Sequence, residues 1–128
     1  ELHVLAQPLN GKVEFVAAVD RFGVIEEYQK ASIFCAPSVW NDPCPLTVLE
    51  GMASGLATAT TRRGGIPEMG ANSVQYFDPD DPSTLAQVLS RLIDDPSERH
   101  QWKEKARARA EAMSWEEQYK VLLKALSS

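Results

Sequence analysis

The chain has 128 residues, of which 44% are hydrophobic and 24% charged. This length and composition predict one globular domain that is large enough to bury a core. The formal net charge of −5 argues against a nucleic-acid partner, because nucleic-acid phosphates attract basic surfaces.

Short apolar runs alternate with helical patterns in the first two thirds of the chain. The opening residues, from Glu1, read as the end of a helix, so the chain is expected to be a piece of a longer protein. Apolar runs bounded by turn residues predict four strands, at Val13–Ala17, Ile33–Ala36, Leu56–Thr60 and Val74–Phe77. Apolar spacing predicts helices over Gly23–Ala31 and Leu46–Ser54, the latter ending at Gly55, and a short helix after Pro67. This alternation predicts an α/β fold with a doubly wound, Rossmann-like parallel sheet of about four strands.

The last third of the chain is predicted to contain only helices. Asp81 and Asp95 are each followed by Pro and Ser, which predicts one helix through about Asp94 and a second to about Met113. Ser114 is predicted to cap a third helix, Trp115–Leu126, with Glu117 completing a capping box.

The two cysteines show no metal-ligand spacing. This predicts reduced thiols in a cytoplasmic protein. No other cluster of residues has the spacing of metal ligands either, so no metal is expected. Cys35 lies in an apolar strand pattern and is predicted to be a small core residue. Cys44 lies in a loop, where it is either a small loop residue or a reactive thiol. No apolar run reaches the roughly 20 residues of a membrane-spanning helix, and no segment resembles a signal peptide.

The most informative segment reads PSVWNDPCPLTVLEGMASGLATATTRRGGIPE, residues 37–68. A strand leads into a polar loop that carries Asp42, and the helix that follows carries Glu50. Parallel α/β proteins bind ligands beyond the carboxyl ends of their strands, and the N–H groups that begin a helix can bind phosphate. Pro45 stands where a helix tolerates proline, in the first turn. The segment therefore predicts a phosphate site flanked by carboxylates, which suits a nucleotide-sugar.

The same segment resembles the C-terminal domain of family 4 retaining glycosyltransferases of the GT-B fold. The resemblance rests on the pair PLTVLE and GGIPE, and it extends more loosely along nearly the whole chain. That family carries two glutamates eight residues apart. Glu50 matches the second, whereas the first position holds Asp42, which is one methylene shorter. Ala17 stands where the family usually has a glycine.

The resemblance implies that Glu50 binds the ribose of the donor and that Asp42 lies near the donor sugar, as the catalytic residue of this chain. Asp42 is not expected to act as a nucleophile, because its carboxylate is set back by about 1.5 Å. The backbone amides of Leu46 and Thr47 are predicted to bind the diphosphate. Together the predicted donor-binding residues are Asp42, Cys44, Pro45, Leu46, Thr47 and Glu50. Glu50 as a surface glutamate, Asp42 as an Asx-turn residue and Thr47 as an ordinary helix residue remain alternatives.

The implied function is transfer of a sugar, with retention, from a nucleotide-sugar to a glycan or lipid-linked acceptor in polysaccharide biosynthesis. The resemblance implies no cofactor, because the nucleotide-sugar is a substrate. Residues 1–128 then form one incomplete C-terminal domain, without its first strand, the family's Arg/Lys pair or the N-terminal acceptor domain. The isolated chain is expected to be inactive. The segment 114–128 is expected to contact the absent domain or, without it, a second copy of the chain. The full-length protein is expected in the cytoplasm, peripheral to the membrane.

Two other functions fit parts of the pattern. A non-catalytic nucleotide-sugar-binding or assembly module on the same fold is one alternative, since Asp42 replaces the usual glutamate. A response-regulator-like signalling domain also has a doubly wound sheet. It would need an acidic cluster after the first strands and a late lysine, whereas the first predicted strand has only Glu14 and the last ends in Phe77-Asp78.

Overall fold

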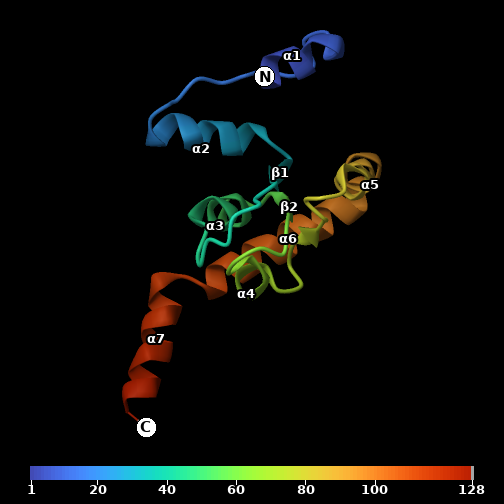
Figure 1. Ribbon diagram of the computed structural model, residues 1–128. Helices are drawn as coiled ribbons and strands as arrows, with labels where there is room; N and C mark the ends of the chain where they lie inside the picture. Colours follow the sequence, from blue (N-terminus) through green and yellow to red (C-terminus); the bar gives the residue numbers. More distant parts are fainter. Residues whose placement is uncertain (128) are drawn as a thin grey trace.

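The computed structural model describes residues 1–127, in which three parallel strands lie between helices (Figure 1). The strands β1 (Ile33–Ala36), β2 (Ala57–Thr60) and β3 (Gln75–Tyr76) form one sheet in that order. Helix α3 (Leu46–Ala53) connects β1 to β2, and α4 (Ile66–Gly70) connects β2 to β3. The predicted parallel α/β class is therefore confirmed, with three strands among the described residues instead of four.

Helices cover both faces of this small sheet. The longest helix, α6 (Pro96–Ala112), crosses the domain and contacts α3, β2 and α5 (Pro82–Asp94) (Figure 1). One buried cluster joins α3, α4 and α6 through Val48, Met52, Ile66, Met69, Val74, Ala106 and Ala110. A second joins β2 to α5 through Ala57, Ala59, Phe77, Val88 and Leu92. Burial of these apolar side chains is the main contribution that holds the helices on the sheet.

Hydroxyl groups fasten the carboxyl end of β1 to that of β2. The buried Thr60 hydroxyl donates to the Ala36 carbonyl at 3.1 Å, and the Thr61 hydroxyl donates to the Ser38 carbonyl at 2.7 Å. A buried hydroxyl without a partner would be costly, so these bonds make threonine acceptable at fully buried positions. They also fix the two loops that leave the sheet at this edge.

The predicted helix ends are largely confirmed. Asp81 and Asp95 accept backbone hydrogen bonds at the starts of α5 and α6. Gly55 follows α3 with a φ of 70°, which glycine adopts without strain, and its N–H donates to the Met52 carbonyl.

The predicted capping box at the last helix is wrong in one half. Ser114 caps α7 (Trp115–Leu126) by accepting from the Glu117 N–H at 3.4 Å. The Glu117 carboxylate does not return this bond; it pairs with Lys120 at 2.6 Å, while the Ser114 N–H donates to the Glu111 carbonyl. The Glu117 carboxylate thus forms an ion pair with Lys120, one turn further along the helix, instead of accepting from the Ser114 N–H.

The predicted strand Val13–Ala17 is also wrong. These residues are extended but unpaired, between the short helices α1 (Leu2–Ala6) and η1 (Gln7–Leu9) and the longer α2 (Arg21–Lys30) (Figure 1). The only neighbour of β1 among residues 1–127 is β2. β-branched and aromatic residues favour a strand, but a strand forms only where another strand accepts its hydrogen bonds.

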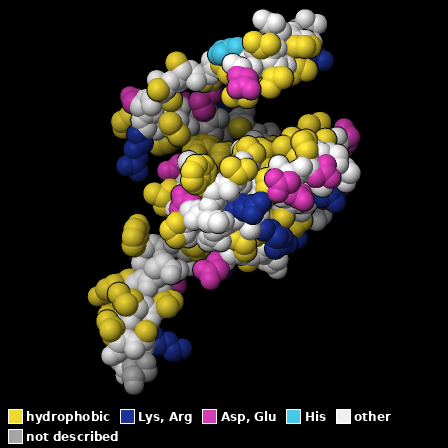
Figure 2. Space-filling model, viewed as in Figure 1, with side chains coloured by type: hydrophobic (Ala, Val, Ile, Leu, Met, Phe, Trp, Pro, Cys, Tyr) yellow, Lys and Arg dark blue, Asp and Glu magenta, His cyan; other side chains and the backbone are white. Residues whose placement is uncertain are grey.

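Helix α7 projects from the far end of α6, away from the sheet (Figure 1). It buries none of its residues, and its large apolar side chains form a visible patch in the space-filling view (Figure 2). These exposed side chains are Trp115, Tyr119, Val121, Leu122, Leu123 and Leu126. Residue 128, the last of the predicted terminal segment 114–128, lies outside the described residues. Within residues 1–127, no helix is both long and apolar enough to cross a membrane.

Candidate functional site

The candidate site is the loop of residues 37–45, which leaves β1, together with the start of α3. The Asp42 carboxylate accepts from the Cys44 N–H at 2.9 Å, so Asp42 does form the Asx-type turn that was one of its two interpretations. One carboxylate oxygen therefore shapes the loop, and the second adds an exposed negative charge at this edge of the sheet. Cys44 is an exposed free thiol.

The loop after β2 is hydrogen-bonded to the loop after β1 and holds it in place. The Gly64 N–H donates to the Asn41 side chain at 3.2 Å, and the Gly65 N–H donates to the Asp42 carbonyl at 2.9 Å. A Cβ at Gly65 would overlap the backbone of Pro43, and Gly64 has a φ of 53°. The two glycines are thus required for close backbone contact between the loops. No sequence motif singled out Asn41 as a residue of this site.

Helix α3 begins without a side-chain cap. Its N-cap residue is Pro45, which has no side-chain oxygen to accept from the first N–H groups of the helix. Leu46 and Thr47 stand at these first positions, and both are exposed. An uncapped helix start presents N–H donors and the positive end of the helix dipole to an anion.

Glu50 lies one turn into α3, on the same side as Leu46 and Thr47. Residues three and four apart share a helix face, and Val48 and Met52 occupy the buried face instead. The Glu50 carboxylate is exposed and accepts a hydrogen bond from the Tyr28 hydroxyl at 3.2 Å. The structure therefore brings the predicted residues from Asp42 to Glu50 together along one loop and one exposed helix face.

A hollow adjoins Asp42 on the open side of the loop. It has a volume of about 510 Å³ and is lined by Val39, Trp40, Asn41 and Asp42. Trp40 is 79% exposed, and its backbone N–H donates to the Ser38 hydroxyl at 3.3 Å. The loop thus holds an aromatic face beside a carboxylate.

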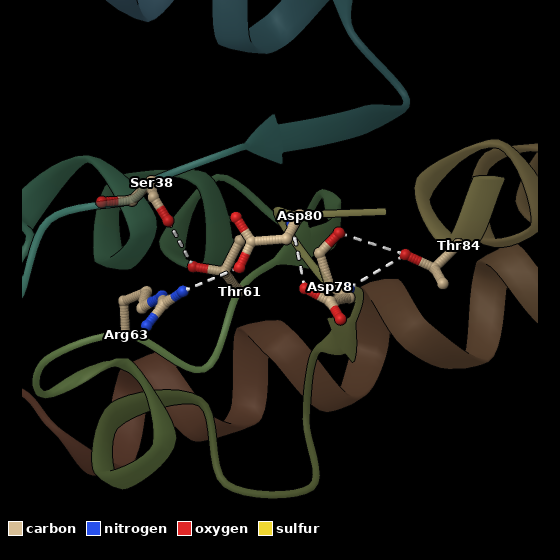
Figure 3. A network of polar contacts seen from close by, with 6 residues as sticks. All are labelled: Ser38, Thr61, Arg63, Asp78, Asp80 and Thr84. Carbon is tan, nitrogen blue, oxygen red and sulfur yellow. Dashed lines mark hydrogen bonds and ion pairs between the residues drawn. The ribbon is translucent and has the colours of Figure 1, made fainter. Parts of the chain in front are cut away.

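The two arginines that follow β2, Arg62 and Arg63, make their contacts on the side of β3. Arg63 pairs with Asp80 of the loop after β3 at 3.3 Å, while the nearby Thr61 hydroxyl donates to the Ser38 carbonyl in the loop after β1 (Figure 3). The Arg62 guanidinium lies over the Tyr76 ring, 3.9 Å from its centroid. Both arginines therefore contact β3 and the loop that follows it.

Two groups near the site have shifted pKa values. Burial raises the pKa of the Cys35 thiol, so this half-buried residue of β1 stays a neutral thiol, as predicted for a core position. Burial, the negative charge of Glu50 and the hydrogen bond to it raise the pKa of Tyr28. The Tyr28 hydroxyl is thus protonated, and able to donate, throughout the neutral range. Among residues 1–127, no three His, Cys, Asp or Glu side chains gather in a way that would hold a metal ion.

Comparison with known proteins finds one matching family model, described as glycosyl transferases group 1, over residues 1–109. The chain is 32% identical over 127 residues to a D-inositol 3-phosphate glycosyltransferase of Corynebacterium jeikeium, covering 96% of this chain. It is 28% identical over 114 residues to spore coat protein SA of Bacillus subtilis, covering 87% of this chain. It spans 30% of the length of each of these relatives.

A solved structure is similar over almost the whole chain. Sucrose-phosphate synthase from Thermosynechococcus elongatus superposes with a TM-score of 0.82 at 26% identity. The superposition covers 98% of this chain and 33% of that one.

Proposed function

Because the chain belongs to the group 1 glycosyl transferases, we propose that it is the donor-binding half of a GT-B enzyme that transfers sugar from a nucleotide-sugar with retention. The observation that carries this proposal is the uncapped start of α3, which shares one exposed face with the Glu50 carboxylate. An anion site and a carboxylate one helical turn apart suit a nucleotide, which has a diphosphate and a ribose diol.

Binding divides between the backbone and one side chain. The N–H groups of Leu46 and Thr47 donate to the diphosphate, with the helix dipole behind them and Pro45 leaving the helix start open. The Glu50 carboxylate accepts from the two ribose hydroxyls, because a carboxylate has two oxygens that accept and none that donates. Cys44, an exposed thiol of the same loop, borders the diphosphate in this proposal.

Transfer breaks the bond between the anomeric carbon of the donor sugar and a diphosphate oxygen. The acceptor hydroxyl bonds to the same face of that carbon, and its proton passes to the departing phosphate oxygen. Asp42 stabilises the positive charge that develops on the sugar ring, through its exposed negative charge. Positioning and charge stabilisation then carry the catalysis, without a metal or a cofactor.

The acceptor, a glycan or a lipid-linked saccharide, binds to a second domain of the full-length protein. The chain covers 30% of the Corynebacterium jeikeium relative and 33% of the sucrose-phosphate synthase, so each of those proteins has room for a second domain beyond the matched part. We place the full-length enzyme in the cytoplasm, at the membrane surface where lipid-linked acceptors are found. The isolated chain is expected to bind donor without transferring its sugar.

A non-catalytic nucleotide-sugar-binding or assembly module is the second candidate. The observation that favours it is the engagement of one Asp42 oxygen by the Cys44 N–H, which gives this carboxylate a structural role. The two candidates differ in one measurement, the release of nucleotide from donor by the full-length protein when acceptor is present. Donor binding without release would support the module.

The test of donor binding is Glu50→Gln in the full-length protein. UDP-, GDP- and ADP-sugars are first screened by thermal stabilisation, because a ligand of the native state raises the melting temperature. For the donor that stabilises most, Glu50→Gln is expected to weaken binding by roughly 1–3 kcal/mol in calorimetry, since a charge-assisted hydrogen bond is lost.

Glu104→Gln is the matched control, since it makes the same change at an exposed position of α6. Donor affinity is expected to be unchanged in this variant. If Glu50→Gln also leaves donor affinity unchanged, Glu50 does not bind the ribose.

A further inference from the structure

Tyr28 of α2 donates a hydrogen bond to Glu50, and no sequence motif predicted this contact. Its hydroxyl lies 3.2 Å from Glu50 Oε2, across 22 residues of sequence. We propose that Tyr28 is a positioning residue for the donor, whose hydroxyl aims the Glu50 carboxylate at the ribose diol. This inference rests on the donor-binding function proposed above, and it adds α2 to the elements that build the site.

The Tyr28 ring is fixed by packing against β1. It meets the Phe34 ring edge-on, with centroids 5.7 Å apart and an interplanar angle of 67°. This is a favourable arrangement for two aromatic rings. Phe34 is in turn seated on Gly51, where any Cβ would overlap its ring. A path of direct contacts therefore runs from Tyr28 through Phe34 to the residue next to Glu50.

This path fixes both ends of the hydrogen bond. Gly51 lets α3 approach β1 closely, so the backbone of Glu50 has a set distance from the Tyr28 ring. The Tyr28 side chain has two rotatable bonds before its rigid ring, whereas the exposed Glu50 side chain has three. Tyrosine is therefore the more rigid partner, and it restricts the glutamate.

The bond also leaves Glu50 able to bind a diol. The two carboxylate oxygens have about four acceptor positions, and Tyr28 occupies one of them on Oε2. The remaining positions suffice for two ribose hydroxyls. Since Tyr28 restricts the carboxylate before the donor arrives, less side-chain entropy is lost on binding. The raised pKa of Tyr28 keeps its hydroxyl protonated, so it remains a donor while the enzyme works.

The experiment compares variants of the full-length protein by calorimetry with UDP, GDP or ADP, whichever gives the largest thermal shift. Tyr28→Phe keeps the ring on Phe34 and removes only the hydroxyl. It is expected to weaken nucleotide binding about threefold to tenfold, the range for a single hydrogen bond. The same substitution in a Glu50→Gln background is expected to change the affinity less than about twofold, because coupled residues are not additive.

Tyr76→Phe is the matched control. Tyr76 is also half-buried, and its hydroxyl donates to the Ala71 carbonyl at 3.0 Å instead of to a carboxylate. This variant is expected to bind nucleotide like the parent protein, which separates the loss of a tyrosine hydroxyl from the loss of the Glu50 contact.

Three results would overturn the inference. Unchanged affinity in Tyr28→Phe, while Glu50→Gln still weakens binding, would remove the role of Tyr28 and leave the proposed function intact. Equal weakening by Tyr28→Phe with and without Glu50 would show that Tyr28 acts independently of that carboxylate. Unchanged affinity in Glu50→Gln would remove the ribose assignment itself, and the role of Tyr28 with it.

Discussion

The sheet with its covering helices, residues 33–113, and the terminal helix α7 use similar apolar patterns with opposite results. Met52 of α3 is completely buried, and Val48, on the same face, is 1% exposed. In α7 the corresponding residues Leu122 and Leu126 are 54% and 74% exposed. The space-filling view shows the consequence, an apolar patch along α7 (Figure 2).

The difference lies in what faces each helix. The buried face of α3 meets α6 and the sheet, whereas α7 leaves the end of α6 with no element of residues 1–127 covering its apolar face. Periodicity therefore predicts that a helix forms and which face is apolar, but it does not predict the partner. Tertiary packing is what gives the α3 pattern its energy.

The largest expected effect is on core stability. Met52→Ala should destabilise the chain by about 2–5 kcal/mol, because it removes buried methylenes and leaves a cavity among tightly packed neighbours. Leu126→Ala is the control on α7, and its expected effect is within about 0.5 kcal/mol, as for other surface changes. Both are measured by urea unfolding. Equal destabilisation by the two variants would show that α7 is packed in solution and would remove the contrast.

The same contrast explains which elements could be predicted from the sequence. Ile33–Ala36 and the strand after Gly55 were predicted well, because each is a short apolar run whose partner lies in the next unit of the fold. Val13–Ala17 has equally suitable residues, yet no strand among the described residues pairs with it. Strand pairing depends on distant segments, so composition alone overpredicts strands.

The candidate site divides in a similar way. The motif located the acidic loop and the uncapped helix start, since proline and glycine constrain the backbone locally. It did not reveal the hydrogen bond from the Gly64 N–H to the Asn41 side chain or the one from the Tyr28 hydroxyl to Glu50. Both join residues more than 20 positions apart, and only the folded sheet brings them into contact.

The next effect concerns association of the exposed helix. We expect concentration-dependent self-association of the isolated chain through the apolar face of α7, because each Å² of apolar surface removed from water is worth about 25 cal/mol. Changing Leu122 and Leu126 together to Ser should shift sedimentation toward the monomer.

A matched control changes Leu2 and Leu5 to Ser. These two leucines of α1 are about as exposed as those of α7, but α1 lies at the opposite end of the molecule (Figure 1). This variant should associate like the parent chain. If the α7 variant stays as associated as the parent, another surface mediates the contact; if the parent is monomeric at every concentration, α7 does not pair with a second copy.

The smallest expected effect compares two helix caps. Asp95 caps α6 within the packed part of the fold and accepts from the N–H groups of Ser97 and Glu98, both at 2.9 Å. Ser114 caps the projecting α7 with one longer bond of 3.4 Å.

Asp95→Ala should cost about 1 kcal/mol of unfolding free energy, the usual loss for a helix cap. Ser114→Ala should lower the helical circular dichroism signal slightly and change the unfolding free energy less, because an unpacked helix can fray before the rest unfolds. If the two substitutions cost the same free energy, α7 unfolds cooperatively with the sheet, and its exposed face belongs to the same folding unit as the core.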